Sequence, residues 1–186
     1  MHLTLTQWIL GLLAAFLVGL SKTGIPGLGI MVVPLLAMAF GGRASVGIML
    51  PMLICGDCFA VLWYRRHAQW DRIVKLYPFI FLGLAIGFVF LWKLDSSGTS
   101  KDILTPIIGW IVILMIALHA LRGKLGNRWA PTSKAGVAGT GTAAGFTTMV
   151  SNAAGPIMSI YMLAQKMDKN QFVGTIAWYF FTINLL

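Results

Sequence analysis

The stretch Gly19-Leu-Ser-Lys-Thr-Gly-Ile-Pro-Gly-Leu-Gly29 decides how this chain folds, because it interrupts a long apolar region with glycine, proline and polar residues. A second interruption, at residues 145–156, reads Gly-Phe-Thr-Thr-Met-Val-Ser-Asn-Ala-Ala-Gly-Pro and again lies between apolar segments. Inside a membrane, non-helical backbone is tolerated only where protein or a water-filled cavity surrounds it. The two breaks therefore predict a place at mid-membrane depth where backbone dipoles approach a solute.

The composition indicates an integral membrane protein. Hydrophobic residues make up 58% of the chain and charged residues 10%, so a soluble domain of this length would lack the polar surface to cover itself. We expect one transmembrane domain over residues 1–186, embedded in the lipid bilayer of a cell membrane, either inner or plasma membrane. The net charge of +9 arises mostly from short segments between apolar runs, which favours a positive-inside topology over a nucleic-acid partner.

Eight apolar segments predict an all-α, polytopic membrane helix bundle. The segments at 44–63 and 103–121 are long enough to span about 30 Å of hydrocarbon, which takes roughly 20 residues. The segments that flank the two breaks are shorter, so the hairpins at 5–40 and 135–165 are either tilted spans or re-entrant half-helices. The remaining apolar segments lie at 77–92 and from 171 to the end.

The loops between these segments predict the orientation. Basic residues gather at 65–75 and at 122–134, whereas the loop at 93–102 balances two lysines with two aspartates. Cytoplasmic loops carry an excess of Lys and Arg, so we expect the first and third loops inside and the middle loop outside. The amino terminus is then expected outside.

The chain also resembles itself, which predicts two inverted repeats. Six pairs of identical residues match, among them Ile30 with Ile157, Leu36 with Leu163 and Gly47 with Gly174. An odd number of crossings separates the two copies, so they should be inverted, with repeat one at about 5–121 and an incomplete repeat two at about 135–186. The second copy then lacks its carboxyl-terminal part, and we expect the chain to be a piece of a longer protein.

The first break has the groups that bind a small oxyanion. Hydroxyls, free backbone N–H groups at a helix start and one ammonium suit such a ligand. Alternatively, Lys22 extends to the cytoplasmic surface from a tight turn, and the glycines serve only that turn. The candidate residues are Ser21, Lys22, Thr23, Gly24, Gly27 and Gly29.

The second break is polar but uncharged. Pro156 is suited to the first turn of a helix, where nearby N–H groups stay free to face a ligand. Its hydroxyls and amide can instead bond a neighbouring helix. The candidate residues here are Thr148, Ser151, Asn152, Gly155 and Pro156.

Asp57 is the one acidic residue within a confidently assigned span, where a carboxylate is costly unless it is paired, protonated or exposed to water. It is a candidate for proton coupling, or a side chain neutralised by a neighbouring helix. His119 is expected at the membrane interface, and Cys55 and Cys58 are expected to be small buried thiols rather than a metal site. No catalytic motif is present, so we predict that the protein is not an enzyme.

These residues resemble a known family. Gly24-Ile-Pro-Gly-Leu-Gly29, followed by Pro34-Leu-Leu36, is similar to the glycine-rich first signature of the sulfite exporter TauE/SafE family of membrane permeases. The second signature resembles residues 145–163, and Phe172-Val-Gly-Thr175 and Gln69-Trp-Asp-Arg72 are also similar to family patterns. The second break departs from the family pattern, because Asn152-Ala-Ala-Gly155 stands where adjacent glycines are expected.

The resemblance implies a permease that moves sulfite, sulfonates or related small organic anions, without an organic cofactor. With the two breaks, it favours a secondary transporter whose inverted halves move around a central site. The alternative is a membrane scaffold or assembly subunit in which the glycines only allow helices to pack closely.

Overall fold

The protein is an all-helical bundle. The computed structural model describes residues 3–22, 28–96, 103–125 and 133–186, and all regular structure in these ranges is helical, as predicted. A helix satisfies its own backbone hydrogen bonds, which is why long apolar runs adopt it in lipid. The elements are α1 (Leu5–Lys22), α2 (Leu28–Phe40), α3 (Gly42–Tyr64), the 3-10 turn η1 (Arg65–His67), α4 (Trp70–Val74), α5 (Tyr77–Ser96), α6 (Leu104–Leu125), α7 (Lys134–Ser151), α8 (Gly155–Ala164) and α9 (Lys169–Asn184).

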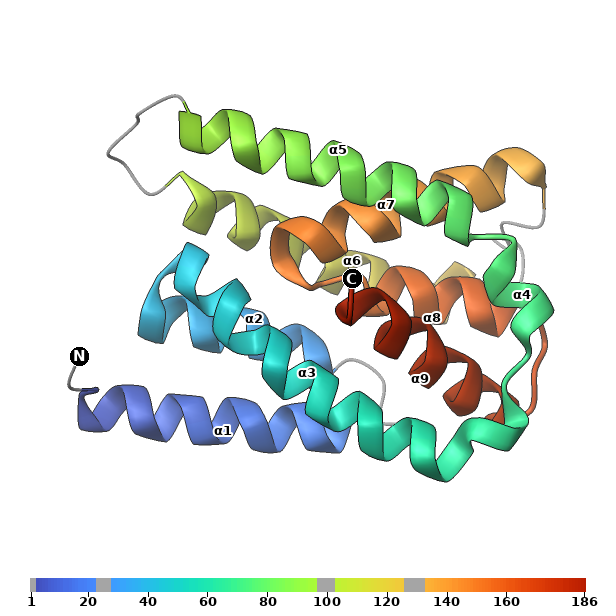
Figure 1. The fold of residues 1–186 in the computed structure, drawn as a ribbon, viewed down its shortest axis with the longest axis horizontal. Helices are drawn as coiled ribbons and strands as arrows, with labels where there is room; N and C mark the ends of the chain where they lie inside the picture. The colour runs from blue at the N-terminus through green and yellow to red at the C-terminus, as the bar shows by residue number, and fades with distance from the viewer. Residues whose placement is uncertain (1–2, 23–27, 97–102, 126–132) are drawn as a thin grey trace.

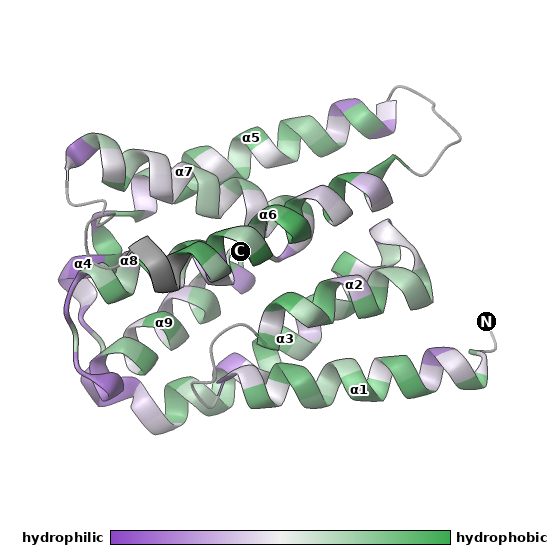
Figure 2. Ribbon diagram, turned by 180° about the vertical axis from the view of Figure 1, so that it is seen from behind, coloured by the Kyte–Doolittle hydropathy of each residue, from purple (hydrophilic) through white to green (hydrophobic). Residues whose placement is uncertain are grey.

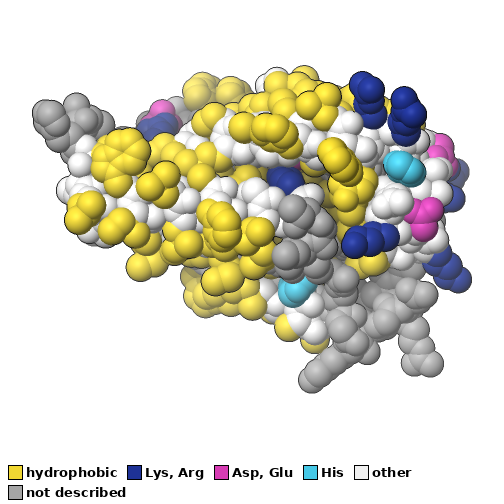
Figure 3. Space-filling view, turned by 90° about the horizontal axis from the view of Figure 1, so that it is seen from below, with side chains coloured by type: hydrophobic (Ala, Val, Ile, Leu, Met, Phe, Trp, Pro, Cys, Tyr) yellow, Lys and Arg dark blue, Asp and Glu magenta, His cyan; other side chains and the backbone are white. Residues whose placement is uncertain are grey.

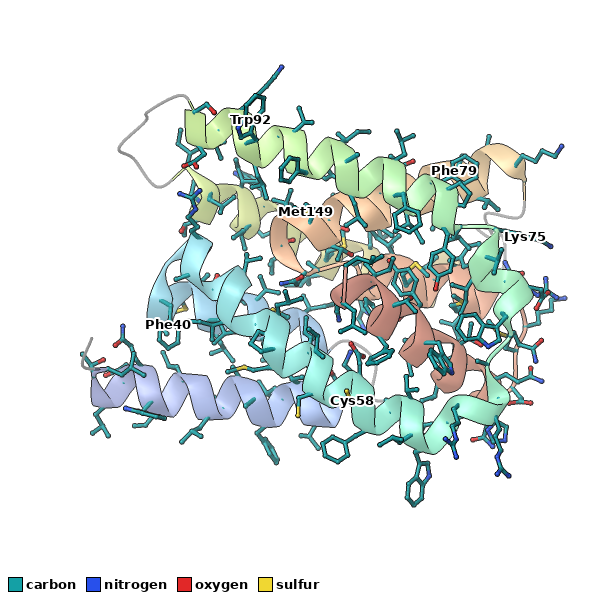
Figure 4. The ribbon with its side chains drawn as sticks, in the orientation of Figure 1. Phe40, Cys58, Lys75, Phe79, Trp92 and Met149 are labelled. Carbon is teal, nitrogen blue, oxygen red and sulfur yellow. The ribbon has the colours of Figure 1, made fainter. Side chains whose placement is uncertain are left out.

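Four helices have the length and apolar composition to cross a membrane, namely Leu5–Lys22, Gly42–His67, Tyr77–Ser96 and Leu104–Leu121. Their outer faces expose large apolar side chains, among them Phe16, Phe59 and Trp92. Trp92 points away from the bundle in Figure 4, and Figure 3 shows apolar side chains over much of one face. The protein is therefore a multi-pass membrane protein. Cys55, expected to be buried, is exposed on this surface, where a thiol is apolar enough to face lipid.

Two hairpins enter the bundle from opposite ends. In Figures 1 and 2, α1 begins at the end where the amino terminus lies and α2 returns to that end, whereas α7 begins at the other end and α8 returns there. With 10 residues, α8 is only about 15 Å long, half of a membrane crossing. This opposed arrangement is what inverted repeats would produce. The sequence repeat itself stays a prediction.

The second break is narrower than the sequence predicts. α7 continues through Gly145 to Ser151, and only residues 152–154 are non-helical. Gly145 serves packing instead: a Cβ added there would overlap the carbonyl oxygen of Ile80 on α5. The turn itself is made by Asn152, whose φ of 52° is left-handed and ends the helix.

α5 and α7 pack closely because glycines lie on both helices. A Cβ added to Gly83 would overlap the carbonyl oxygen of Thr142, and one added to Gly87 would come within 2.8 Å of the Met149 Cβ. Met149 is labelled on this side of α7 in Figure 4. Small residues at every fourth position let two membrane helices approach closely, so α5 and α7 form one tightly packed pair.

Hydrophilic residues gather at one end of the bundle. Figure 2 shows them around η1 and α4, at the end opposite the amino terminus, and Lys75 is labelled at this end in Figure 4. We call it the basic end, after Arg65, Arg66, Arg72, Lys75 and Lys134. At the other end, Arg43 and Asp95 form an exposed ion pair, with 3.0 Å between Nη1 and Oδ1. Arg128 and the loop at 97–102 lie outside the described residues.

Candidate functional site

A cavity of about 430 Å³ lies where the two hairpins meet. From the first break it is lined by Ser21, Lys22 and Gly29, and from the second by Thr148, Asn152, Gly155 and Pro156. Ser151 is fully buried and does not line the cavity. Thr23, Gly24 and Gly27 lie outside the described residues. The structure therefore brings both breaks to one space, as the opposed hairpins require.

The charged centre of the cavity is an ion pair between Lys22 and Asp57. The Lys22 Nζ lies 2.5 Å from Asp57 Oδ1, and the side-chain amide of Asn184 donates to Asp57 Oδ2 at 2.8 Å. The Lys22 Nζ also lies 4.8 Å from the centroid of the Phe180 ring, within cation–π range. Both carboxylate oxygens are thus held by donors from α1 and α9. Lys22 therefore points into the cavity toward Asp57 and does not extend to the membrane surface, which was the alternative.

Three helices place this group. Lys22 is in the last turn of α1, where the helix dipole favours a cation. Gly56 on α3 leaves room for the lysine stem, because a Cβ there would come within 3.2 Å of the Lys22 Cγ. The ammonium can therefore reach the next residue of α3, Asp57. On α9, Phe180 and Asn184 are four residues apart and share one face.

α9 is held in position by its first half. Asp168 caps it through a capping box with Gln171. Gly174 lies against the end of α3, since an added Cβ would come within 2.7 Å of the Tyr64 carbonyl oxygen. The Thr175 hydroxyl accepts a hydrogen bond from the Gln69 backbone N–H at 2.9 Å. These contacts set the direction in which α9 carries Asn184 to Asp57.

The hydroxyls of the two breaks already use their protons within their own helices. Ser21 donates to the Val18 carbonyl at 2.7 Å, and Thr148 donates to the Ala144 carbonyl at 2.8 Å. Ser151 likewise donates to the Thr147 carbonyl at 3.0 Å. Each hydroxyl has one proton, so in this state Ser21 and Thr148 present only acceptor lone pairs to the cavity. We expected them to donate to an oxyanion, and the structure directs their protons elsewhere.

The donors that remain at the second break belong to Asn152 and to the start of α8. The Asn152 side-chain amide donates to the Val46 carbonyl on α3 at 3.2 Å and keeps a second N–H. α8 begins at Gly155 without a side-chain cap, and Pro156 lies in its first turn, as predicted. A Cβ added to Gly155 would meet no atom within 4 Å, so this glycine faces open space rather than a packed helix.

The cavity extends from this centre toward the basic end. Its lining there includes the half-buried His119 of α6, Leu163 of α8, Met167 between α8 and α9, and Lys169 at the start of α9. Between the charged centre and the opposite end of the bundle there is a cluster of buried side chains from α2 and α6, among them Leu36. Apolar side chains make up most of the walls, namely Ile30, Met49, Leu53, Ala60, Phe172, Val173, Ile176, Ala177 and Phe180.

Sequence reasoning missed the α9 contribution. Asn184 is an amide within an apolar helix, which is itself a signal of a functional or buried polar contact. Its partner, Asp57, is distant in sequence, so the pattern alone did not connect them. Among the described residues, no three His, Cys, Asp or Glu side chains come together to hold a metal ion.

The comparison with known families decides what kind of protein this is. A model of the family described as Sulfite exporter TauE/SafE matches residues 10–186. The chain belongs to the sulfite exporter TauE/SafE family. This confirms the resemblance, and the match includes every residue that lines the cavity. TauE/SafE proteins are membrane permeases for anions such as sulfite.

The structure also explains two TauE/SafE patterns in this chain. One pattern is Phe172-Val-Gly-Thr175 at the start of α9. Its first two residues line the cavity, and its last two, Gly174 and Thr175, make the contacts described above that hold α9 in position. The second pattern, Gln69-Trp-Asp-Arg72, lies against α9 and the end of α8. Its Gln69 backbone N–H donates to Thr175, and its Arg72 side chain donates to the Gln165 side chain at 3.0 Å. Neither a search of curated proteins nor a search of solved structures finds a match to this TauE/SafE chain.

Proposed function

We propose that this protein is a secondary transporter that moves small anions through the central cavity, with sulfite, sulfonates or related organic anions as substrates. The observation that carries the proposal is Lys22, whose ammonium lies in a cavity where two opposed hairpins meet. Half-helices that meet in the middle of a membrane are a common basis of substrate sites in transporters. The start of α8 adds a positive helix end at the same place.

The walls of the cavity favour an organic anion. A sulfonate group near Lys22 and Asn152 would leave its carbon part against the apolar wall, which Met49, Leu53 and Phe180 line. Burial of that part contributes roughly 25 cal/mol per Å² of apolar surface removed from water. Sulfite gains nothing from these walls, so we propose that sulfonates bind more tightly than sulfite.

The direction in which the cavity extends supports a state that is open to the cytoplasm. The lining runs toward the basic end, and the positive-inside rule places that end in the cytoplasm. The amino terminus, at the other end, is then outside, in an inner or plasma membrane. Transport would require the hairpins to rearrange so that the apolar cluster around Leu36 opens and the basic end closes.

Flux measurements on the full-length protein in liposomes test this function. We expect the wild type to move sulfite and benzenesulfonate, Lys22→Ala to reduce the rate by about tenfold or more, and Asn152→Ala to reduce it less. Lys134→Ala is the matched control, because this exposed lysine begins α7 outside the cavity. Unchanged flux in both cavity variants would rule out a substrate site at the two breaks. If the wild type moves neither anion, the transporter function is wrong.

A scaffold role remains the second candidate, and the α5–α7 contact is the observation that favours it. Gly83, Gly87 and Gly145 pack helices closely, as a structural subunit would need. Gly155 does not pack, and a scaffold gives no reason for a half-buried lysine that lines a cavity. The flux assay separates the two functions.

A further inference from the structure

We propose that anion binding in this cavity takes up a proton: the anion replaces Asp57 on Lys22, and the displaced Asp57 carboxylate becomes protonated. The inference rests on the proposed function, because it concerns the same cavity and the same class of substrate. It adds the ion that is coupled to the anion and the exchange of partners by which the coupling occurs.

The first argument is that the strong donors at the inner end of the cavity already hold Asp57. The Lys22 ammonium contacts one carboxylate oxygen at 2.5 Å, and the Asn184 amide donates to the other at 2.8 Å. The hydroxyls of Ser21 and Thr148 donate to helix carbonyls. An anion that enters this state therefore finds the Lys22 charge already neutralised by another anion, and it gains the full interaction with that charge only when it replaces Asp57.

The second argument concerns charge. Asp57 is fully buried and the Lys22 side chain is 15% exposed, so the pair lies in a region where solvent screens charge poorly. Two anions beside one ammonium would leave a negative charge without a partner, which is costly at this depth. Protonation of Asp57 removes that charge: one O–H bond forms on the carboxylate, and Lys22 remains an ammonium. The neutral carboxyl then serves as a donor to the anion or as an acceptor for Asn184.

The other titratable groups at the cavity are few and lie elsewhere along it. His119 faces the cavity from α6, and Lys169 faces it from α9. The described residues of α2, α7 and α8 bring no charged or titratable side chain to the lining, and α3 brings none besides Asp57. Among the described lining residues, His119 is the other side chain that could take up the proton in place of Asp57, so the experiment has to separate the two.

The exchange has a consequence for energetics. One monovalent anion and one proton occupy the site together, so the loaded site carries the same net charge as the empty one. Transport of a sulfonate would then be an electroneutral cotransport with a proton. By linkage, a lower pH tightens anion binding, and the bound anion in turn raises the affinity of the site for a proton.

Calorimetry on the purified full-length protein tests the exchange, with benzenesulfonate as the probe because it keeps one negative charge throughout. Titrations in buffers of different ionisation enthalpy measure the protons taken up per anion bound. We expect about one proton per anion for the wild type, with affinity rising by about tenfold per unit fall in pH over the range of uptake. In Asp57→Asn, which resembles a protonated aspartate, we expect binding without proton uptake and without pH dependence.

His119→Gln is the matched control, and it should keep the uptake of about one proton. Loss of uptake in His119→Gln with retention in Asp57→Asn would overturn the proposal. So would wild-type binding or flux that proceeds without proton uptake, even though transport itself would then stand. Absence of both binding and flux in the wild type would instead remove the proposed function. If Asp57→Asn does not fold, the wild-type and His119→Gln titrations still decide whether a proton is taken up with the anion and whether His119 accepts it.

Discussion

The α5–α7 contact and the central cavity both depend on glycine, but they use it in opposite ways. Gly83 and Gly145 lie where an added Cβ would overlap the backbone of the facing helix. Gly155 lies where an added Cβ would meet no atom within 4 Å. The first region is a tightly packed interface, and the second keeps space free beside Lys22. Glycines in this chain therefore serve two purposes, close helix packing and an open site.

The largest loss of stability is expected where α5 and α7 pack together. Gly145→Leu forces a large side chain into the Ile80 carbonyl, so we expect a loss of more than about 4 kcal/mol of stability and no folded protein. Size-exclusion chromatography in detergent would show aggregation. Gly139→Leu is the control on the same helix, because a Cβ there meets no atom within 4 Å. A monodisperse Gly145→Leu protein would mean that α5 and α7 do not pack as described.

The next effect separates stability from function in the cavity. Lys22→Met leaves Asp57 buried without its ion partner, which should cost about 3 kcal/mol. Combining Lys22→Met with Asp57→Asn removes the unpaired charge. We therefore expect the unfolding temperature of the double variant in detergent to return close to that of the wild type. Because the double variant still lacks the ammonium, its anion binding should remain weaker than that of the wild type by about tenfold or more. Equal stability of the single and double variants would show that the two charges are not coupled.

The smallest change in stability is expected at Gly155, which lines the cavity. Gly155→Ala adds a methyl group to open space, so we expect stability within about 0.5 kcal/mol of the wild type. Because the methyl group lies at the start of α8 in the cavity, benzenesulfonate binding should weaken by severalfold in calorimetry. A stability loss without a change in binding would instead assign Gly155 to packing, like Gly145.

Much of the fold could be predicted from the sequence, because apolar runs and the glycine, proline and polar residues that interrupt them are local signals. The long spans, the position of Pro156 in the first turn of α8 and the convergence of the two breaks follow from such signals. The role of Gly145 did not, since its meaning depends on Ile80, on a helix far away in the sequence. The same holds for Asp57, whose partners Lys22 and Asn184 come from two other helices.

The hydroxyls show a different limit. A sequence gives Ser21 and Thr148 as possible donors, but it does not say where each single proton points. In apolar surroundings the carbonyl one turn back is always within reach, and both residues use it here. A prediction of ligand contacts therefore needs to count protons already engaged within the helix.

The Lys22–Asp57 pair also bears on how the chain is inserted into the bilayer during synthesis. Asp57 lies within α3, and an isolated aspartate at the centre of an inserting helix costs about 2.5–3.5 kcal/mol. α1 precedes α3 in the chain, so its terminal lysine is already at the membrane when Asp57 arrives. We therefore expect α3 to insert at a lower cost when α1 is already in the membrane, because Lys22 can then pair with Asp57.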